Sequence, residues 1–312
     1  MNRRQALAML AVGTALDPTR LLAADVIRVS EQPIDASFEV SYAQAQGFTT
    51  QAGLNVDIQL MSNGAASMAA VAGGSVDIGN TNIFSALTAH ERGVPLVLVA
   101  PGSVYNSKTP SSFIMVPKDS NVRSARDLNG KTIAVDGLRN ITQYGPMAWA
   151  DKNGGDAQSL RFVEMPFADM PIALATHRID AAVIAEPFAS RATESRSLAS
   201  AYDGIGASFL IGGWMATRSW VAANATAAKS FARMIYRTAA WANANHDASA
   251  ETLVRVAKID PSNLKTLVRA SFAERYDPSM IQTVIDVALK YGAITKPVKP
   301  ADILASAMPR SA

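Results

Sequence analysis

The chain has 312 residues, of which 49% are hydrophobic and 18% charged, and its formal net charge is +3. This composition excludes an intrinsically disordered chain, and the length suffices for two compact domains. The sequence contains no cysteine, which excludes disulfides, thiolate chemistry and a lipid anchor on an N-terminal Cys.

The N-terminus has the plan of a secretory signal peptide. Arg3-Arg4 precedes an apolar run over residues 6–16, and Ala23-Ala24 stands just before Asp25. A basic start, a short apolar segment and a small-residue end are typical of export signals. We therefore expect a signal peptide over 1–24 and a periplasmic protein, with Arg3-Arg4 suggesting the twin-arginine route. Its removal deletes three arginines and one aspartate and lowers the formal charge from +3 to +1, which indicates no nucleic-acid surface.

From Val26 onward, short apolar runs alternate with helical patterns, which predicts parallel sheets covered by helices. The first series of predicted elements comprises strands at 26–29, 54–60, 76–79 and 95–100, with helices at 36–51, 62–74 and 82–92. The second series comprises strands at 111–116, 131–135, 160–165 and 181–185, with helices at 141–152 and 168–176.

After residue 211 the pattern becomes wholly helical, with helices predicted at 225–245, 248–258, 261–273 and 278–291. These helices have no strands of their own to cover, so we expect them to return to the first lobe. The chain would then cross twice between lobes, near 109–112 and near 207–215, and both crossings would act as hinges. The predicted organisation is the signal peptide 1–24, a discontinuous first lobe of 25–110 plus 213–312, and a second lobe of 111–212.

The sequence lacks the usual parts of an active site. It has three histidines, no His or Cys pair at metal-ligand spacing, and no phosphate-binding or nucleophile-elbow motif. We therefore predict no catalytic residue, no metal and no cofactor.

Polar residues instead gather where predicted strands end and helices begin, the place where open α/β sheets bind ligands. Unpaired N–H groups at a helix start favour an anionic group without any Lys or Arg. The candidate ligand-binding residues in these loops are Gln32, Asn63, Gly64, Thr81, Asn82, Arg139, Asn140 and Thr142. The alternative role of the asparagines and Thr81 is helix capping alone, and that of Arg139 is a solvated surface charge.

Two further candidates lie at predicted lobe boundaries. Glu186 ends a predicted buried strand and is placed to accept a hydrogen bond from a ligand, or else from a backbone N–H. Trp214, beside Gly212-Gly213, is a candidate aromatic wall of the cleft, with core packing as the alternative.

Several short motifs, in order, carry a family resemblance over residues 26–215. They include Ala72-Gly73-Gly74-Ser75-Val76-Asp77-Ile78-Gly79, Asp127-Leu128-Asn129-Gly130-Lys131, and Arg178-Ile179-Asp180 followed by Glu186-Pro187-Phe188. The chain resembles the periplasmic substrate-binding proteins of nitrate, taurine and aliphatic sulfonate ABC transporters. The resemblance implies an α/β periplasmic binding protein fold of type II, with two Rossmann-like lobes joined by two hinge crossings.

The resemblance also implies a monomeric receptor that closes on a small solute and delivers it to an inner-membrane permease driven by a cytoplasmic ATPase. The solute would be a sulfonate, taurine, an aromatic acid or a pyrimidine-like compound. The first loop, residues 30–35, carries Glu31 and Asp35, which weakens a nitrate or sulfate assignment and favours a neutral, zwitterionic or N–H-bearing ligand. Two alternatives stay open: a sensory binding protein, and an enzyme on the same fold of the thiamine-pyrimidine or menaquinone-precursor type.

Overall fold

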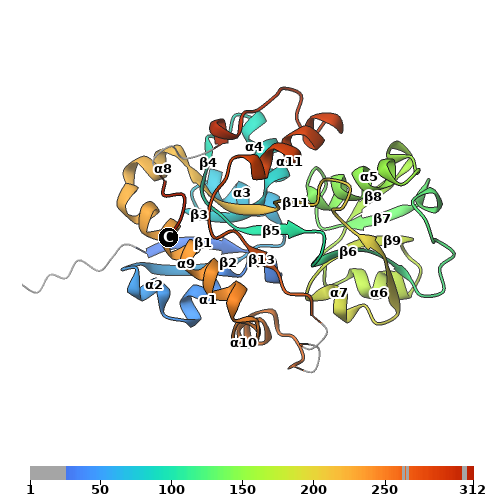
Figure 1. Cartoon of the computed structure of the whole chain (residues 1–312), viewed down its shortest axis with the longest axis horizontal. Coiled ribbons are helices and arrows are strands. Elements are labelled where there is room, and N and C mark those ends of the chain that lie inside the picture. Colours follow the sequence, from blue (N-terminus) through green and yellow to red (C-terminus); the bar gives the residue numbers. More distant parts are fainter. Residues whose placement is uncertain (1–25, 262–263, 265–266, 304–307) are drawn as a thin grey trace, which may run out of the picture.

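The computed structural model describes residues 26–261, 264, 267–303 and 308–312, so the predicted signal peptide lies outside the described residues. The strands and helices form two α/β lobes that lie side by side (Figure 1). Within the described residues, no helix is long and apolar enough to span a membrane.

The first lobe is built on a five-stranded sheet with the strand order β2-β1-β3-β12-β4. Its strands are β1 (Val26–Glu31), β2 (Asn55–Leu60), β3 (Ile78–Asn82), β4 (Leu96–Pro101) and β12 (Gly212–Thr217). Strand β1 runs parallel to β2 and β3, whereas β12 lies antiparallel between β3 and β4. The carboxyl ends of β1 and β3 therefore lie at the same edge of this sheet.

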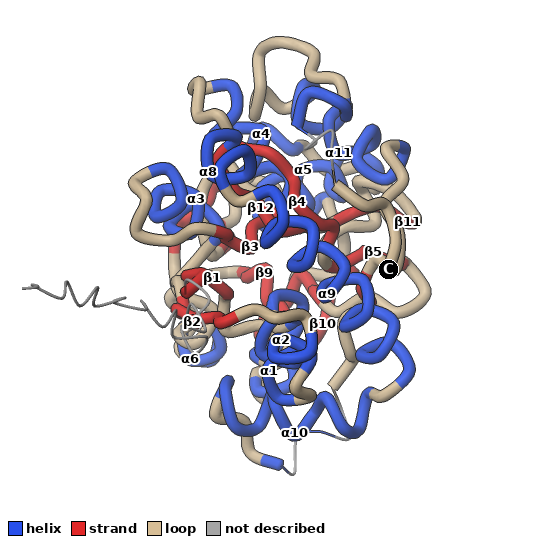
Figure 2. Tube along the Cα trace, turned by 90° about the vertical axis from the view of Figure 1, so that its left-hand side faces the viewer, coloured by secondary structure: helices blue, strands red, loops and turns tan. Residues whose placement is uncertain are grey.

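Helices cover both faces of this sheet, with α3 and α4 on one face and α1, α2 and α9 on the other (Figures 1 and 2). The α-helices of this lobe are α1 (Glu39–Ala45), α2 (Phe48–Gln51), α3 (Gly64–Ala72), α4 (Ile83–Glu91), α8 (Arg218–Ala223), α9 (Ala225–Ala244), α10 (His246–Ala257) and α11 (Ser279–Lys290). Short 3-10 helices lie at Asp35–Ser37 and Pro300–Ile303. Helix α9 buries Phe231 and Ile235 against the sheet, in one core cluster with Trp214.

The second lobe is built on a five-stranded sheet with the order β10-β6-β9-β7-β8. Its elements are β6 (Ser112–Pro117), β7 (Thr132–Val135), α5 (Ile141–Lys152), β8 (Arg161–Glu164), α6 (Met170–Ala175), β9 (Ala181–Ala185), α7 (Phe188–Arg191) and β10 (Ser195–Ser200), with 3-10 helices at Arg126–Leu128 and Ala157–Ser159. Strands β7, β8 and β9 are parallel, so their carboxyl ends share one edge.

A small antiparallel sheet, β11-β5-β13, joins the lobes. Its strands are β5 (Ser103–Asn106), β11 (Ser208–Leu210) and β13 (Ser271–Phe272). Strand β5 leads through 107–111 into the second lobe, and the chain returns through 201–207 into β11. Because β5 and β11 pair with each other, the two connections between the lobes run next to one another.

The structure contains strands β5 and β10, which were not predicted, and differs from several of the predicted elements. The helix predicted at 36–51 is divided, because Gly47 adopts the left-handed conformation with φ +71° between α1 and α2. In the range predicted as a helix at 261–273, residues Ser271–Phe272 form strand β13 instead.

Strand β12 falls in a region predicted to be helical. A Cβ atom added at Gly212 would lie 2.6 Å from the main-chain oxygen of Thr81, so the lack of a side chain allows β12 to enter the sheet there.

Candidate functional site

The carboxyl ends of β1 and β3 face those of β7 and β9 across the boundary between the lobes, and a small cavity of about 40 Å³ lies between them. Its polar lining residues come from both lobes and from the connecting strands: Gln32, Asn80, Asn82, Ser103, Ser112, Asp136, Thr142 and Tyr202. Its apolar lining includes Ile34, Ile141 and Phe167. This volume holds only a few water molecules, so an organic solute requires the lobes to move apart.

Asp136 provides the buried carboxyl group of this cavity. It follows β7 directly and is only 7% exposed. Its Oδ1 accepts hydrogen bonds from Asn140 Nδ2 at 2.9 Å and from Thr142 Oγ1 at 2.6 Å. Burial raises the pKa of the Asp136 carboxyl, while these two donors act in the opposite direction. The group can accept a hydrogen bond from a ligand that brings its own donor.

Asn80 provides a donor on the opposite wall. The side chain lies on β3, is 4% exposed, and its Nδ2 has no hydrogen-bond partner among the described residues. Buried amide N–H groups are almost always paired, so an unpaired one beside a cavity indicates a ligand or water contact. Asn80 and Asp136 together offer a donor and an acceptor from different lobes.

Three of the candidate residues predicted from sequence line the cavity: Gln32, Asn82 and Thr142. Asn82 is also the N-cap of α4, because its Oδ1 accepts from Ser85 N at 2.9 Å. The Asn82 side chain therefore both lines the cavity and caps α4.

The remaining loop candidates lie beside the cavity and hold its walls. Asn63 and Asn140 cap α3 and α5, accepting from Ala66 N and Thr142 N at 2.9 Å each. Gly64 lies against Thr81 so closely that an added Cβ would be 2.3 Å from Thr81 Oγ1.

Glu186 and Trp214 are placed elsewhere. Both carboxylate oxygens of Glu186 accept from Ser190, at 3.0 Å from N and 2.8 Å from Oγ, so this side chain holds the start of α7. Trp214 is fully buried between α1 and α9 and donates Nε1–H to Glu39 Oε2 at 2.8 Å. Strand β12 directs Trp214 into the core, so it forms no aromatic wall of the cavity.

Arg139 lies outside the cavity as well. Its Nη2 donates to the main-chain oxygen of Ala293 at 3.0 Å, and its side chain borders a different pocket.

The acidic residues of the first loop do not face the cavity either. Glu31 Oε1 accepts from Val40 N and Ser41 N at 2.9 and 3.0 Å, which caps α1. Asp35 forms a buried ion pair with Arg269 at 2.8 Å. Glu31 and Asp35 therefore give no reason against an anionic ligand, and Asp136 is the acid that lines the cavity.

Sequence reasoning missed Asp136 and Asn80. Asp136 could have been predicted from the sequence, because it directly follows a buried strand and precedes Gly137, which places it at the ligand-binding edge of a sheet. Among the described residues that line the cavity, none is Lys or Arg. Among all the residues that the structure describes, no group of three or more His, Cys, Asp or Glu is placed to hold a metal ion.

Solved structures with the same fold include solute-binding proteins and an enzyme. The alkanesulfonate-binding protein SsuA from Xanthomonas axonopodis pv. citri, bound to MOPS, matches with a TM-score of 0.76 and 21% identity, over 90% of this chain and 98% of that one. The periplasmic nitrate-binding protein NrtA from Synechocystis PCC 6803 matches with a TM-score of 0.74 and 12% identity, over 90% and 85%. The desulfurization enzyme DSZB matches with a TM-score of 0.63 and 14% identity, over 90% and 96%.

These matches confirm the predicted fold class, an α/β fold with two lobes of the type found in periplasmic binding proteins. A search of curated proteins for relatives by sequence finds none. The sequence profile described as NMT1/THI5 like matches residues 37–249. The chain therefore belongs to the NMT1/THI5-like family.

Proposed function

We propose that this protein is an exported solute-binding receptor, which closes its two lobes on a small organic solute and delivers it to a membrane permease driven by an ATPase. The observation that carries the proposal is the cavity between the lobes. It is lined by a hydrogen-bond donor on Asn80 and an acceptor on Asp136. Contacts from both lobes give a ligand a higher affinity for the closed arrangement than for the open one. The structural likeness to alkanesulfonate-binding and nitrate-binding proteins supports the same role.

The lining favours one class of solute. Asp136 lines the cavity, and none of the described lining residues is Lys or Arg. A compact inorganic anion would meet a carboxylate without a compensating cation. We therefore propose a neutral or cationic solute that carries N–H or O–H donors and a carbonyl or ring-nitrogen acceptor, with Phe167 and Ile141 contacting its apolar face.

The test is thermal unfolding of residues 25–312 against taurine, alkanesulfonates, nitrate, aromatic carboxylates, pyrimidines and ureides. A solute held at about 100 times its dissociation constant adds about 2.7 kcal/mol of stability, which is seen as a higher midpoint. We expect a shift with pyrimidines or ureides and none with nitrate.

Matched variants assign the shift to the cavity. Asp136→Asn and Asn80→Ala should each weaken binding about 10-fold or more, because each removes a polar contact in a buried site. Asp57→Asn and Asn55→Ala, on the exposed side chains of β2, should leave binding unchanged. A shift with nitrate or sulfonates alone would overturn the proposed solute class. Turnover of a solute by the purified protein would replace the receptor with an enzyme on this fold.

A further inference from the structure

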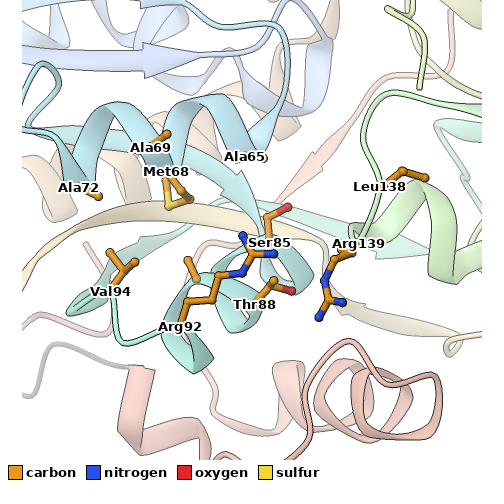
Figure 3. A pocket seen from close by; sticks show the side chains of 11 residues that line it. Ala65, Met68, Ala69, Ala72, Ser85, Thr88, Arg92, Val94, Leu138 and Arg139 are labelled. Atoms are coloured by element: carbon orange, nitrogen blue, oxygen red, sulfur yellow. The ribbon is translucent and has the colours of Figure 1, made fainter. Parts of the chain in front are cut away.

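A second pocket of about 260 Å³ lies where α3 and α4 of the first lobe meet the loop after β7 of the second lobe (Figure 3). It shares no lining residue with the cavity that contains Asn80 and Asp136. The hydrogen bond from Asn63 Nδ2 to the main-chain oxygen of Asp136, at 3.1 Å, lies at the junction of the two spaces. The loop then continues to Leu138 and Arg139, which line the second pocket. The two spaces are therefore separate sites.

One end of this pocket is polar and positively charged. Ser85, Thr88 and Arg92 reach it from α4 and the residue after it, and Arg139 faces them from the second lobe (Figure 3). The Thr88 side chain is 7% exposed, and its buried Oγ1 has no hydrogen-bond partner among the described residues. The Arg92 guanidinium forms no ion pair within the described part of the chain. Thr88 and Arg92 therefore offer a hydroxyl and a guanidinium without an acceptor or ion-pair partner among the described residues.

The two arginines of this end keep free donors, while the acids near it are already bonded. Arg139 uses one N–H on the main-chain oxygen of Ala293 and keeps its other donors. Two acids lie near this end. Glu164 Oε1 accepts from Leu138 N at 2.6 Å. The pKa of Glu91 is lowered by Thr295, whose N and Oγ1 both donate to the Glu91 carboxylate, and to a smaller extent by Arg139. Arg92 and Arg139 keep unused guanidinium donors, whereas both carboxylates already accept from protein N–H or O–H groups, so the pocket can bind an anion through the two arginines.

The other end of the pocket is apolar. Met68 is buried there, and Val94 lines the pocket close to it (Figure 3). Leu138 lines the pocket next to Arg139 and is 44% exposed (Figure 3). Small side chains at the α3 positions Ala65, Ala69 and Ala72 leave the space open.

We propose that this second pocket binds a small organic anion, a carboxylate or sulfonate on a short apolar chain, with its charged group at Arg92, Arg139 and Thr88. Because Leu138 and Arg139 belong to the second lobe and the remaining lining to the first, the bound anion links the lobes. The bound anion therefore stabilises the arrangement of the lobes seen in this structure.

Isothermal titration of residues 25–312 with hexanoate tests this site directly, with hexylammonium as the charge control. We expect saturable binding of hexanoate and none of hexylammonium. Arg92→Ala in the first lobe and Arg139→Ala in the second should each weaken hexanoate binding about 10-fold or more. Ala69→Phe should block it by filling the apolar end.

Two control variants distinguish hexanoate binding in this pocket from binding elsewhere on the protein. Arg255→Ala removes an exposed arginine on α10, on the opposite side of the first lobe (Figure 1), and should leave hexanoate binding unchanged. Asn80→Ala should retain hexanoate binding, because Asn80 belongs to the other cavity. The proposal is overturned by the absence of saturable hexanoate binding, by equal effects of Arg92→Ala and Arg255→Ala, or by loss of binding in Asn80→Ala alone. None of these outcomes depends on the solute of the receptor.

Discussion

Asn63 in the first lobe donates its side-chain amide to the main-chain oxygen of Asp136 in the second lobe, with an N–O distance of 3.1 Å. The same side chain accepts from Ala66 N at 2.9 Å and so caps α3. One asparagine thus fixes the start of a helix and fastens the two lobes together, which makes it a sensitive point for closure.

Replacing Asn63 with serine separates these two roles. Serine caps helices about as well as asparagine, but it is too short to reach Asp136. For Asn63→Ser we expect a change of less than about 1 kcal/mol in the free energy of unfolding. We also expect a larger radius of gyration in small-angle X-ray scattering, because the lobes separate more often. Asp156→Ser alters a cap within the second lobe and serves as the control. Equal radii for both variants would show that this bond does not hold the lobes together.

The bond between Trp214 and Glu39 supports the core of the first lobe. Burial raises the pKa of the Glu39 carboxyl well above its usual value, and the Trp214 Nε1–H opposes this rise. Trp214→Phe should reduce the free energy of unfolding by about 1–3 kcal/mol in urea denaturation, since it leaves a buried oxygen without a donor. Trp220→Phe should cost less, because this half-buried side chain forms no hydrogen bond with any residue that the structure describes. If the two variants are equally stable, the bond contributes nothing beyond ring packing.

The ion pair of Arg269 and Asp35 ties the segment before β13 to the first loop. The two side chains are 9% and 2% exposed, and Asp35 Oδ2 also accepts from Ala270 N at 2.9 Å. Arg269→Ala should destabilise the protein by about 3–5 kcal/mol, because it leaves a buried carboxylate unpaired. Arg255→Ala, on an exposed side chain, should stay within about 0.5 kcal/mol. Chemical denaturation of both variants measures the difference, and a similar loss in each would contradict the assigned role.

The sequence predicted those features that depend on neighbours in the chain. Asn63, Asn82 and Asn140 were recognised at helix starts, and all three cap helices in the structure. Local hydrogen bonds of this kind need only two or three residues of sequence.

Features that depend on distant pairing could not be predicted in this way. Trp214 and Glu39 are 175 residues apart, and only the insertion of β12 between β3 and β4 brings them together. Glu31 was expected to face the ligand, but its side chain caps α1 instead. A strand end reveals which edge of the sheet a residue occupies, but not which way its side chain turns. The same limit hid Asn80, whose unpaired amide becomes evident only when both walls of the cavity are present.

The pKa of Glu31 makes a prediction about pH. Burial raises the pKa of this carboxyl from 4.5 to about 7, although Ser41 and Val40 donate to it and act in the opposite direction. In the unfolded chain the carboxyl ionises near its ordinary pKa, whereas in the folded protein it keeps its proton up to about pH 7. The folded state therefore binds more protons between these two values, and stability falls as the pH rises through this window.

Glu31→Gln tests this linkage, because glutamine keeps an acceptor for the N-cap of α1 and cannot ionise. One proton bound only in the folded state changes the free energy of unfolding by at most about 1.4 kcal/mol per pH unit. We expect the native protein to lose stability between pH 4.5 and 7, and Glu31→Gln to lose less over the same window. Urea denaturation at intervals of pH measures both curves, and their difference isolates Glu31 from the other buried acids. Parallel curves would mean that Glu31 ionises near its ordinary pKa in the folded protein, because its hydrogen bonds from Val40 and Ser41 offset the effect of burial.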